Sequence, residues 1–321
     1  MHIAEGILPA GWAAANYAAA TPFVLAGAHK ITRMAKDRPA VKPLIGLLGA
    51  GVFVISALPI PVPIAGTCSH PTGIGIVALL LGPLPAATLT MVALIIQALF
   101  MAHGGISTLG ANTLNMGVIG AFSGYVAFVL CRRMKLSLAI GAFAAGFVAD
   151  LATYAGTAGS LSLALHGNIS IGTAWLTIAV AFVPTQLPLA IFEGIITAGV
   201  FTAIQERRPD ILSGINKSFL KASKPFSART WGLAGAISLL VLLGFSLFKT
   251  SSWEGVDVSV VERYAGEFGA AAKEPFLNIT GDMLLFIFTL AGVTGGFFMG
   301  YIWREFFKNP HGVKYRDKTE V

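Results

Sequence analysis

The first two residues of the chain have the composition of a metal-chelating terminus. An N-terminal residue supplies an α-amine with a pKa near 8. A histidine at position 2 places its imidazole and its amide nitrogen within chelating reach of the Met1 amine. With one further imidazole, such a set would form a planar nitrogen site. This geometry is typical of Cu(II) or Ni(II), and Co(II) is a neighbour in the same series.

His70 is the candidate for the further imidazole. It lies in the segment GTCSHPTG (residues 66–73), directly before a short apolar run. A histidine near a membrane interface is also a common hydrogen-bonding group, and the residue types alone leave both interpretations of His2 and His70 open.

Other polar residues lie in or beside apolar runs. His103, in AHGG (residues 102–105), is expected to be an exposed loop residue, with assistance to metal entry as the alternative. Asn112 and Asn115 are expected either to cap a helix or to orient a ligand histidine. Glu193 is either functional or a structural partner of a neighbouring helix. Thr67 and Ser69 are further candidates for supporting or pathway roles.

The elements that position these residues are predicted to be membrane helices. The chain is 55% hydrophobic and only 12% charged, whereas soluble domains carry about 25% charged residues. Its net charge of +7 does not indicate nucleic acid binding, because the basic residues form short clusters between apolar runs. The predicted spans are 10–29, 43–60, 71–82, 85–102, 113–131, 136–155, 171–204, 230–248 and 281–303.

The distribution of Lys and Arg predicts the orientation. The segments 30–42, 131–135, 205–229 and 304–318 contain 19 of the 22 basic residues. If they are cytoplasmic, the N-terminus, the 60–70 segment, the 103–112 loop and the 249–280 loop lie outside, and the C-terminus lies in the cytoplasm. The run 71–82 is too short to cross about 30 Å of hydrocarbon. It is therefore expected to lie inside the bundle, with residues 64–73 dipping inward as a candidate site.

The chain is predicted to have two parts. Residues 1–204 form an all-α core of about seven spans, and a basic cytoplasmic linker covers 205–229. Residues 230–321 form a two-helix C-terminal hairpin with an extracytoplasmic loop and a cytoplasmic tail. No Walker-A pattern occurs, so the chain is expected to be no enzyme and to depend on a partner or an ion gradient for energy.

Three segments resemble the CbiM/NikM family, the substrate-specific components of energy-coupling factor transporters for cobalt and nickel. They are MHIAEG (1–6), CSHPTG (68–73) and LGANTLNMG (109–117), and LPLAIFEG (187–194) is similar to a further family segment. The resemblance covers roughly residues 1–205. The region 230–303 resembles, by topology, the small CbiN/NikN partner fused to the same chain.

The resemblance implies that metal is bound by the Met1 amine, the His2 amide nitrogen, the His2 ring and the His70 ring. It implies a transmembrane partner subunit and two ATP-binding subunits in a prokaryotic cell membrane, and no prosthetic group besides the transported Ni²⁺ or Co²⁺. Two alternatives are a secondary transporter of a small organic solute and a non-transport membrane scaffold. The sequence does not separate cobalt from nickel, since both suit nitrogen ligands.

Overall fold

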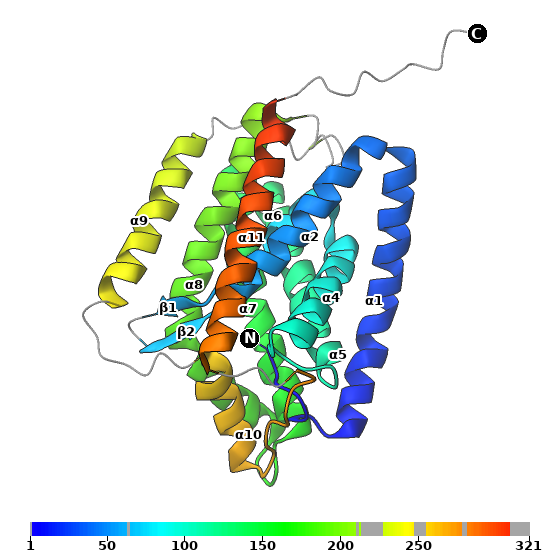
Figure 1. The fold of residues 1–321 in the computed structure, drawn as a ribbon, viewed down its shortest axis with the longest axis vertical. Helices are drawn as coiled ribbons and strands as arrows, with labels where there is room; N and C mark the ends of the chain where they lie inside the picture. Colours follow the sequence, from blue (N-terminus) through cyan, green and yellow to red (C-terminus); the bar gives the residue numbers. More distant parts are fainter. Residues whose placement is uncertain are drawn as a thin grey trace.

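The chain folds into a helical bundle in the computed structural model (Figure 1). The structure describes residues 2–62, 65–209, 212, 227–246, 255–277 and 281–308. Five helices within these residues are long and apolar enough to cross a membrane: Pro83–Phe100, Leu109–Arg133, Leu138–Ala164, Ile171–Arg207 and Phe286–Arg304. The prediction of a helical membrane protein is confirmed, while the number of membrane crossings stays a prediction.

Every predicted span overlaps a helix, although several helices extend beyond the predicted ends. The core consists of α1 (Ala10–Asp37), α2 (Lys42–Ala57), α3 (Ile74–Leu81), α4 (Pro83–Phe100), α5 (Leu109–Asn112), a π-helical stretch (Thr113–Gly120), α6 (Ala121–Arg133), α7 (Leu138–Ala164) and α8 (Ile171–Arg207). The remainder consists of α9 (Ala228–Ser246), a second π-helical stretch (Asp257–Glu262), α10 (Arg263–Glu267) and α11 (Gly281–Lys308).

Helix α3 is short and lies wholly inside the bundle, as predicted from its length. All of its residues are buried, and it packs against α4, α6 and α7. Gly75 permits this position, because a Cβ added there would lie 2.8 Å from the Cα of Gly146 in α7. The helix begins after Gly73, whose φ of +65° is a left-handed conformation that favours glycine.

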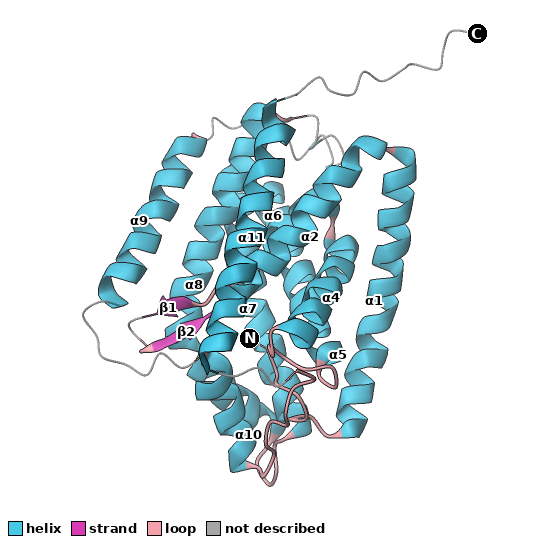
Figure 2. Cartoon of the chain, viewed as in Figure 1, coloured by secondary structure: helices cyan, strands magenta, loops and turns pink. Residues whose placement is uncertain are grey.

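A two-stranded hairpin leads into α3 (Figure 2). Strand β1 (Ile60–Val62) pairs with β2 (Thr67–Ser69) in antiparallel register. The loop that follows β2 is held by Glu193 of α8. Its carboxylate accepts hydrogen bonds from the Thr72 amide at 2.8 Å, the Thr72 hydroxyl at 2.5 Å and the Gly73 amide at 2.7 Å. These contacts are those of a structural partner.

The two C-terminal helices pack on different elements of the core. Within the described residues, α9 packs on α8 and β1, whereas α11 packs on α2. The organisation of residues 230–321 as a two-helix hairpin with an extracytoplasmic loop stays a prediction. The prediction of a linker at 205–229 falls mostly on residues 210, 211 and 213–226, which lie outside the described part of the chain, as do residues 309–321.

Most basic residues of the described helices lie at one end of the bundle. The α1–α2 junction and the end of α11 lie at the top of Figure 1, and α5 and α10 lie at the bottom. The top therefore carries basic residues of the 30–42 segment and Arg304. This separation agrees with the charge clusters that predict the orientation, and the orientation itself stays a prediction.

Candidate metal centre

The amino-terminal segment before α1 runs into the bundle. Ile3, Ile7 and Leu8 are buried in the core. The backbone of Ile3 is fully hydrogen-bonded: its amide donates to Asn112 Oδ1 at 2.8 Å, and its carbonyl accepts from Asn112 Nδ2 at 3.1 Å and from the Thr108 hydroxyl at 2.6 Å. A buried backbone needs such partners, so these contacts fix the position of the adjacent His2.

A second set of contacts holds the next turn of the same segment. The Gly6 amide donates to the Ser107 hydroxyl at 3.0 Å, and the Ser107 amide donates to Glu5 Oε2 at 3.1 Å. The carbonyl of Glu5 accepts from the Lys273 amide at 2.8 Å. The 103–108 loop and the region beyond α10 therefore enclose the amino-terminal segment on two sides.

Three histidines from distant parts of the chain meet where this segment begins. His2, His70 and His103 are only 1%, 6% and 8% exposed. The ring centroids of His2 and His103 are 4.0 Å apart, and those of His70 and His103 are 4.5 Å apart. The expectation of an exposed His103 is wrong. The loop after α4 folds inward, where the His103 amide donates to the carbonyl of Gln97 at 3.3 Å.

Several ring nitrogens in this cluster have no hydrogen-bond partner among the described residues. They are both nitrogens of His2, Nδ1 of His70 and Nδ1 of His103. Buried polar atoms are almost always paired, so an unpaired set requires an explanation. Neutral imidazole nitrogens are the commonest metal ligands in proteins. The ring of His70 is also hydrogen-bonded to the backbone of Ala57, which is the usual arrangement of a metal-ligating histidine.

The electrostatic environment keeps His2 and His70 neutral. Burial and the neighbouring His103 lower the pKa of His2 well below its usual value, and the same two causes lower the pKa of His70. A neutral imidazole can donate a lone pair to a metal, whereas an imidazolium cannot. His2 and His70 are therefore in the protonation state that binds a cation near neutral pH.

A carboxylate from the tail completes the cluster. Asp257, at the start of the second π-helical stretch, accepts a hydrogen bond from the His2 amide at 3.1 Å, and its other oxygen lies 3.1 Å from His103 Nε2. Burial opposes its ionisation, but nearby positive charge and the hydrogen bond with His103 hold the pKa of Asp257 well below its usual value. One ligand atom from each of His2, His103 and Asp257 lies within 4.8 Å of the others.

The other predicted site residues have the following partners. Asn112 makes no capping hydrogen bond, and its side chain binds the backbone of Ile3, the neighbour of His2. Asn115 accepts a hydrogen bond from the Ser160 hydroxyl at 3.0 Å, away from the histidines. The Ser69 hydroxyl lies 2.8 Å from that of Tyr154 and accepts from Gln186 Nε2 at 2.7 Å. Thr67 lies in β2, with a buried hydroxyl that has no partner among the described residues.

For two residues, Met1 and Asp257, the structure and the sequence prediction cannot be compared directly. Met1, the predicted amine ligand, lies outside the described residues. Asp257 was not singled out from the sequence, because it is one of several acidic residues in the 249–280 loop. Only its burial beside His2 and His103 distinguishes it from them.

Comparisons with known proteins match most of the chain. A family model described as the cobalt uptake substrate-specific transmembrane region, CbiM, matches residues 2–211. The cobalt transport protein CbiM of Geobacter sulfurreducens is 47% identical over 310 residues, which cover 95% of this chain and 89% of that protein. The CbiM of Sorangium cellulosum is 51% identical over 212 residues, which cover 66% of this chain and 94% of the relative.

Two solved structures of transition metal transporters are similar to this chain. A crystal structure of a truncated transition metal transporter is similar with a TM-score of 0.56 and 31% identity, covering 64% of this chain and 99% of that chain. A second transition metal transporter structure has a TM-score of 0.55 and 30% identity, covering 64% of this chain and 93% of that one. The likeness to both is therefore in the fold as well as in the sequence.

The Asn112→Ala variant tests the anchor of the amino-terminal segment. It leaves the buried Ile3 amide without a partner, at a cost of about 1–3 kcal/mol. We expect faster hydrogen–deuterium exchange in the peptide that contains Ile3, measured by mass spectrometry. Asn115→Ala is the matched control, since Asn115 is equally buried but contacts Ser160. Equal exchange in the two variants would show that Asn112 does not anchor the segment.

Proposed function

Because this chain belongs to the CbiM family of cobalt uptake substrate-specific transmembrane proteins, we propose that it captures Co²⁺ or Ni²⁺ for import across a prokaryotic cell membrane. The observation that carries the proposal is the group of buried histidines whose ring nitrogens have no hydrogen-bond partner among the described residues. The site favours a metal ion over a small organic solute, because the inward-facing polar atoms are imidazole nitrogens and a carboxylate. A membrane scaffold would have no use for such a group.

The proposed ligands are the Met1 amine, the amide nitrogen and ring of His2, and the ring of His70. Support comes from the proximity of the His2 and His70 rings to the same neighbour, His103, with ring centroids 4.0 Å and 4.5 Å from it. A planar nitrogen site suits Ni²⁺ and its neighbour Co²⁺. The family name favours cobalt as the cargo, and nickel remains the second candidate.

Asp257 and His103 are proposed to position His2. Before metal binds, Asp257 accepts the hydrogen bond of the His2 amide and so orients the nitrogen that is proposed to lose this proton and coordinate the metal; it also contacts His103. Its negative charge lies where a divalent cation would bind, so it adds attraction to the cargo. We propose a two-part organisation, with a core of residues 1–204 and a tail of residues 230–321. In this organisation the tail contributes to metal binding, because it supplies Asp257 to the site of the core.

The remaining parts of the proposal concern the assembly and its orientation. We propose that a separate membrane subunit and two ATP-binding subunits drive import, since the chain carries no Walker-A pattern. We also propose that the histidine end of the bundle is extracytoplasmic. Its support is the position of the basic residues at the opposite end.

Blocking the amino terminus tests the amine ligand. A chain with one glycine left before Met1 after tag cleavage moves the amine away from His2. We expect loss of Co²⁺ binding, measured as metal content of the purified protein by mass spectrometry. The matched control carries the additional glycine at the C-terminus and keeps its metal. Normal metal content in the N-terminal variant would refute the proposed ligand set.

The Asp257→Asn variant tests the contribution of the tail. The substitution keeps the size of the side chain but removes the charge that the His2 amide and His103 contact. Loss of such a partner typically weakens metal binding by about 10–100-fold, and we expect this reduction in Co²⁺ affinity by isothermal titration calorimetry. Glu267→Gln is the control, because Glu267 is an exposed acid of the same region. Equal affinities in the two variants would remove Asp257 from the site.

The affinity is expected to depend on pH through proton release. The proposed amine and amide ligands lose their protons on binding, so affinity falls as the pH drops below about 7, by about tenfold per pH unit for each proton released. The lowered pKa values of His2 and His70 mean that these rings stay neutral in this range. Titrations at several pH values in buffers of different ionisation enthalpy measure the released protons. An affinity that is unchanged between about pH 6 and 8 would contradict amine and amide coordination.

A further inference from the structure

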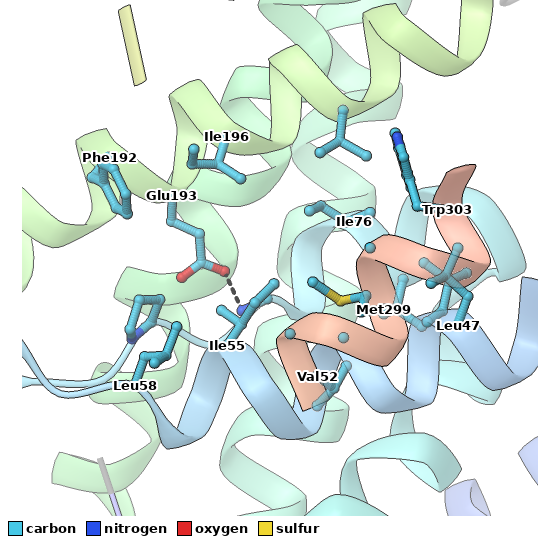
Figure 3. Close-up of a pocket in the computed structure, with 18 of the residues that line it drawn as sticks. Leu47, Val52, Ile55, Leu58, Ile76, Phe192, Glu193, Ile196, Met299 and Trp303 are labelled. Carbon is cyan, nitrogen blue, oxygen red and sulfur yellow. Dashed lines mark hydrogen bonds between the residues drawn. The ribbon is translucent and has the colours of Figure 1, made fainter. Parts of the chain in front are cut away.

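An elongated apolar cavity of about 590 Å³ lies between the core and the tail helices, and none of the three clustered histidines lines it. Its volume is within the range of roughly 300–1,000 Å³ that is typical of ligand sites. Figure 3 shows that α2, α8 and α11 surround it, with Leu47 and Val52, Phe192 and Ile196, and Met299 and Trp303 on its walls. Leu239 of α9 also lines it.

The cavity has the shape and lining of a channel for a hydrocarbon chain. It follows α2 from Leu44 to Leu58, which corresponds to roughly 20 Å of helical rise. Its walls are almost entirely aliphatic and aromatic. The exception is Glu193, whose carboxylate is already engaged by the amides of Thr72 and Gly73.

The cavity exists because the tail helices do not close over it. Within the described residues, α9 packs mainly on α8 and α11 packs mainly on α2. Two glycines of α11, Gly296 and Gly300, line the space, and a Cβ added to either would meet no atom within 4 Å. A space of this kind between membrane helices is surrounded by lipid, so the available occupant is an acyl chain.

One end of the cavity carries positive charge from three helices. Lys42 precedes the lining residue Leu44, Arg207 lies one turn beyond Ile204, and Arg304 follows Trp303. Basic residues between membrane helices at the bilayer surface bind anionic lipid headgroups. The apolar channel and its basic rim are therefore complementary to the two parts of one phospholipid.

We infer that the cavity between α2, α8, α9 and α11 binds one anionic phospholipid, with an acyl chain in the channel and the phosphate at the rim of Lys42, Arg207 and Arg304. The lipid adds contacts between the tail helices and the core to the direct packing of α9 on α8 and of α11 on α2. The far end of the channel reaches Pro71 and Gly73, so the bound chain also contacts the loop that carries His70.

Native mass spectrometry of the full-length, delipidated protein in mild detergent tests this site. The probes are dioleoylphosphatidylglycerol, which is anionic, and dioleoylphosphatidylcholine, which is zwitterionic. We expect one phosphatidylglycerol to be retained per chain in preference to phosphatidylcholine. The double variant Gly296→Leu/Gly300→Leu fills the channel and is expected to weaken this binding at least about tenfold. Gly232→Leu is the matched control, since Gly232 is an open helical glycine of α9 that does not line the cavity.

The rim is tested separately from the channel. Lys42→Gln and Arg304→Gln are each expected to weaken phosphatidylglycerol binding about fivefold and to leave phosphatidylcholine binding unchanged. Arg33→Gln is the control, because Arg33 pairs with Asp37 elsewhere on the same end of the bundle. A Co²⁺ titration and the thermal transition of each variant verify that it is folded.

Three results would overturn the inference. Unchanged lipid retention in the filled variant would show that the lipid binds elsewhere. Equal binding of both lipids, unaffected by the rim variants, would exclude the proposed headgroup contacts. A dimer that disappears in the filled variant while the lipid count stays constant would assign the face to a second copy of the chain.

Discussion

The hydrogen bonds of Asn112 and Thr108 to the backbone of Ile3 are the constraint on which the site depends. An irregular segment can enter an apolar bundle only if its peptide groups find partners there. Asn112 offers both a donor and an acceptor, so one side chain satisfies both groups of Ile3. His2 directly precedes Ile3, so the hydrogen bonds to Ile3 also fix the position of His2.

Buried hydrogen bonds also fix the loop that carries His70, the other proposed ring ligand. The loop that carries His70 is fixed by Glu193, and the preceding Ser69 contacts Tyr154 and Gln186. The Glu193 carboxylate and the Ser69 hydroxyl are both hydrogen-bonded, which makes their surroundings rigid. The ring nitrogens of His2 and His70 that remain unpaired are therefore held in place by neighbours that are paired. A rigid, incompletely satisfied group of this kind is suited to take a ligand from solution.

The tail belongs to the same physical unit as the core, although its helices contact the core separately. Asp257 brings a carboxylate to the histidines, and the Lys273 amide binds the carbonyl of Glu5. At the level of the helices, α9 and α11 leave an apolar channel against α2 and α8. The tail therefore contributes the Asp257 carboxylate to the site and, from α11, the ring of Phe288, whose centroid lies 5.6 Å from that of His103.

The sequence by itself determined the helical membrane class, the positions of the apolar helices and the family. These depend on local properties, namely hydropathy, charge clusters and short motifs such as CSHPTG, and they need no knowledge of distant contacts. The length of the run 71–82 was also sufficient to predict a buried short helix, because a helix rises by a fixed distance per residue. His2 and His70 could be proposed for the same reason, since their motifs are local.

Only the tertiary structure decided that His103 is buried, that Asn112 holds Ile3, and that Asp257 lies beside His2. Asp257 is separated from His2 by 255 positions, and nothing in its neighbours distinguishes it from other acids of the same loop. The sequence also did not predict the packing of α9 on α8 and of α11 on α2. The reason is that an apolar helix carries no local signal of which neighbour it contacts. Such pairings follow from the folding of the whole chain, in which burial and hydrogen bonding of distant segments are satisfied together.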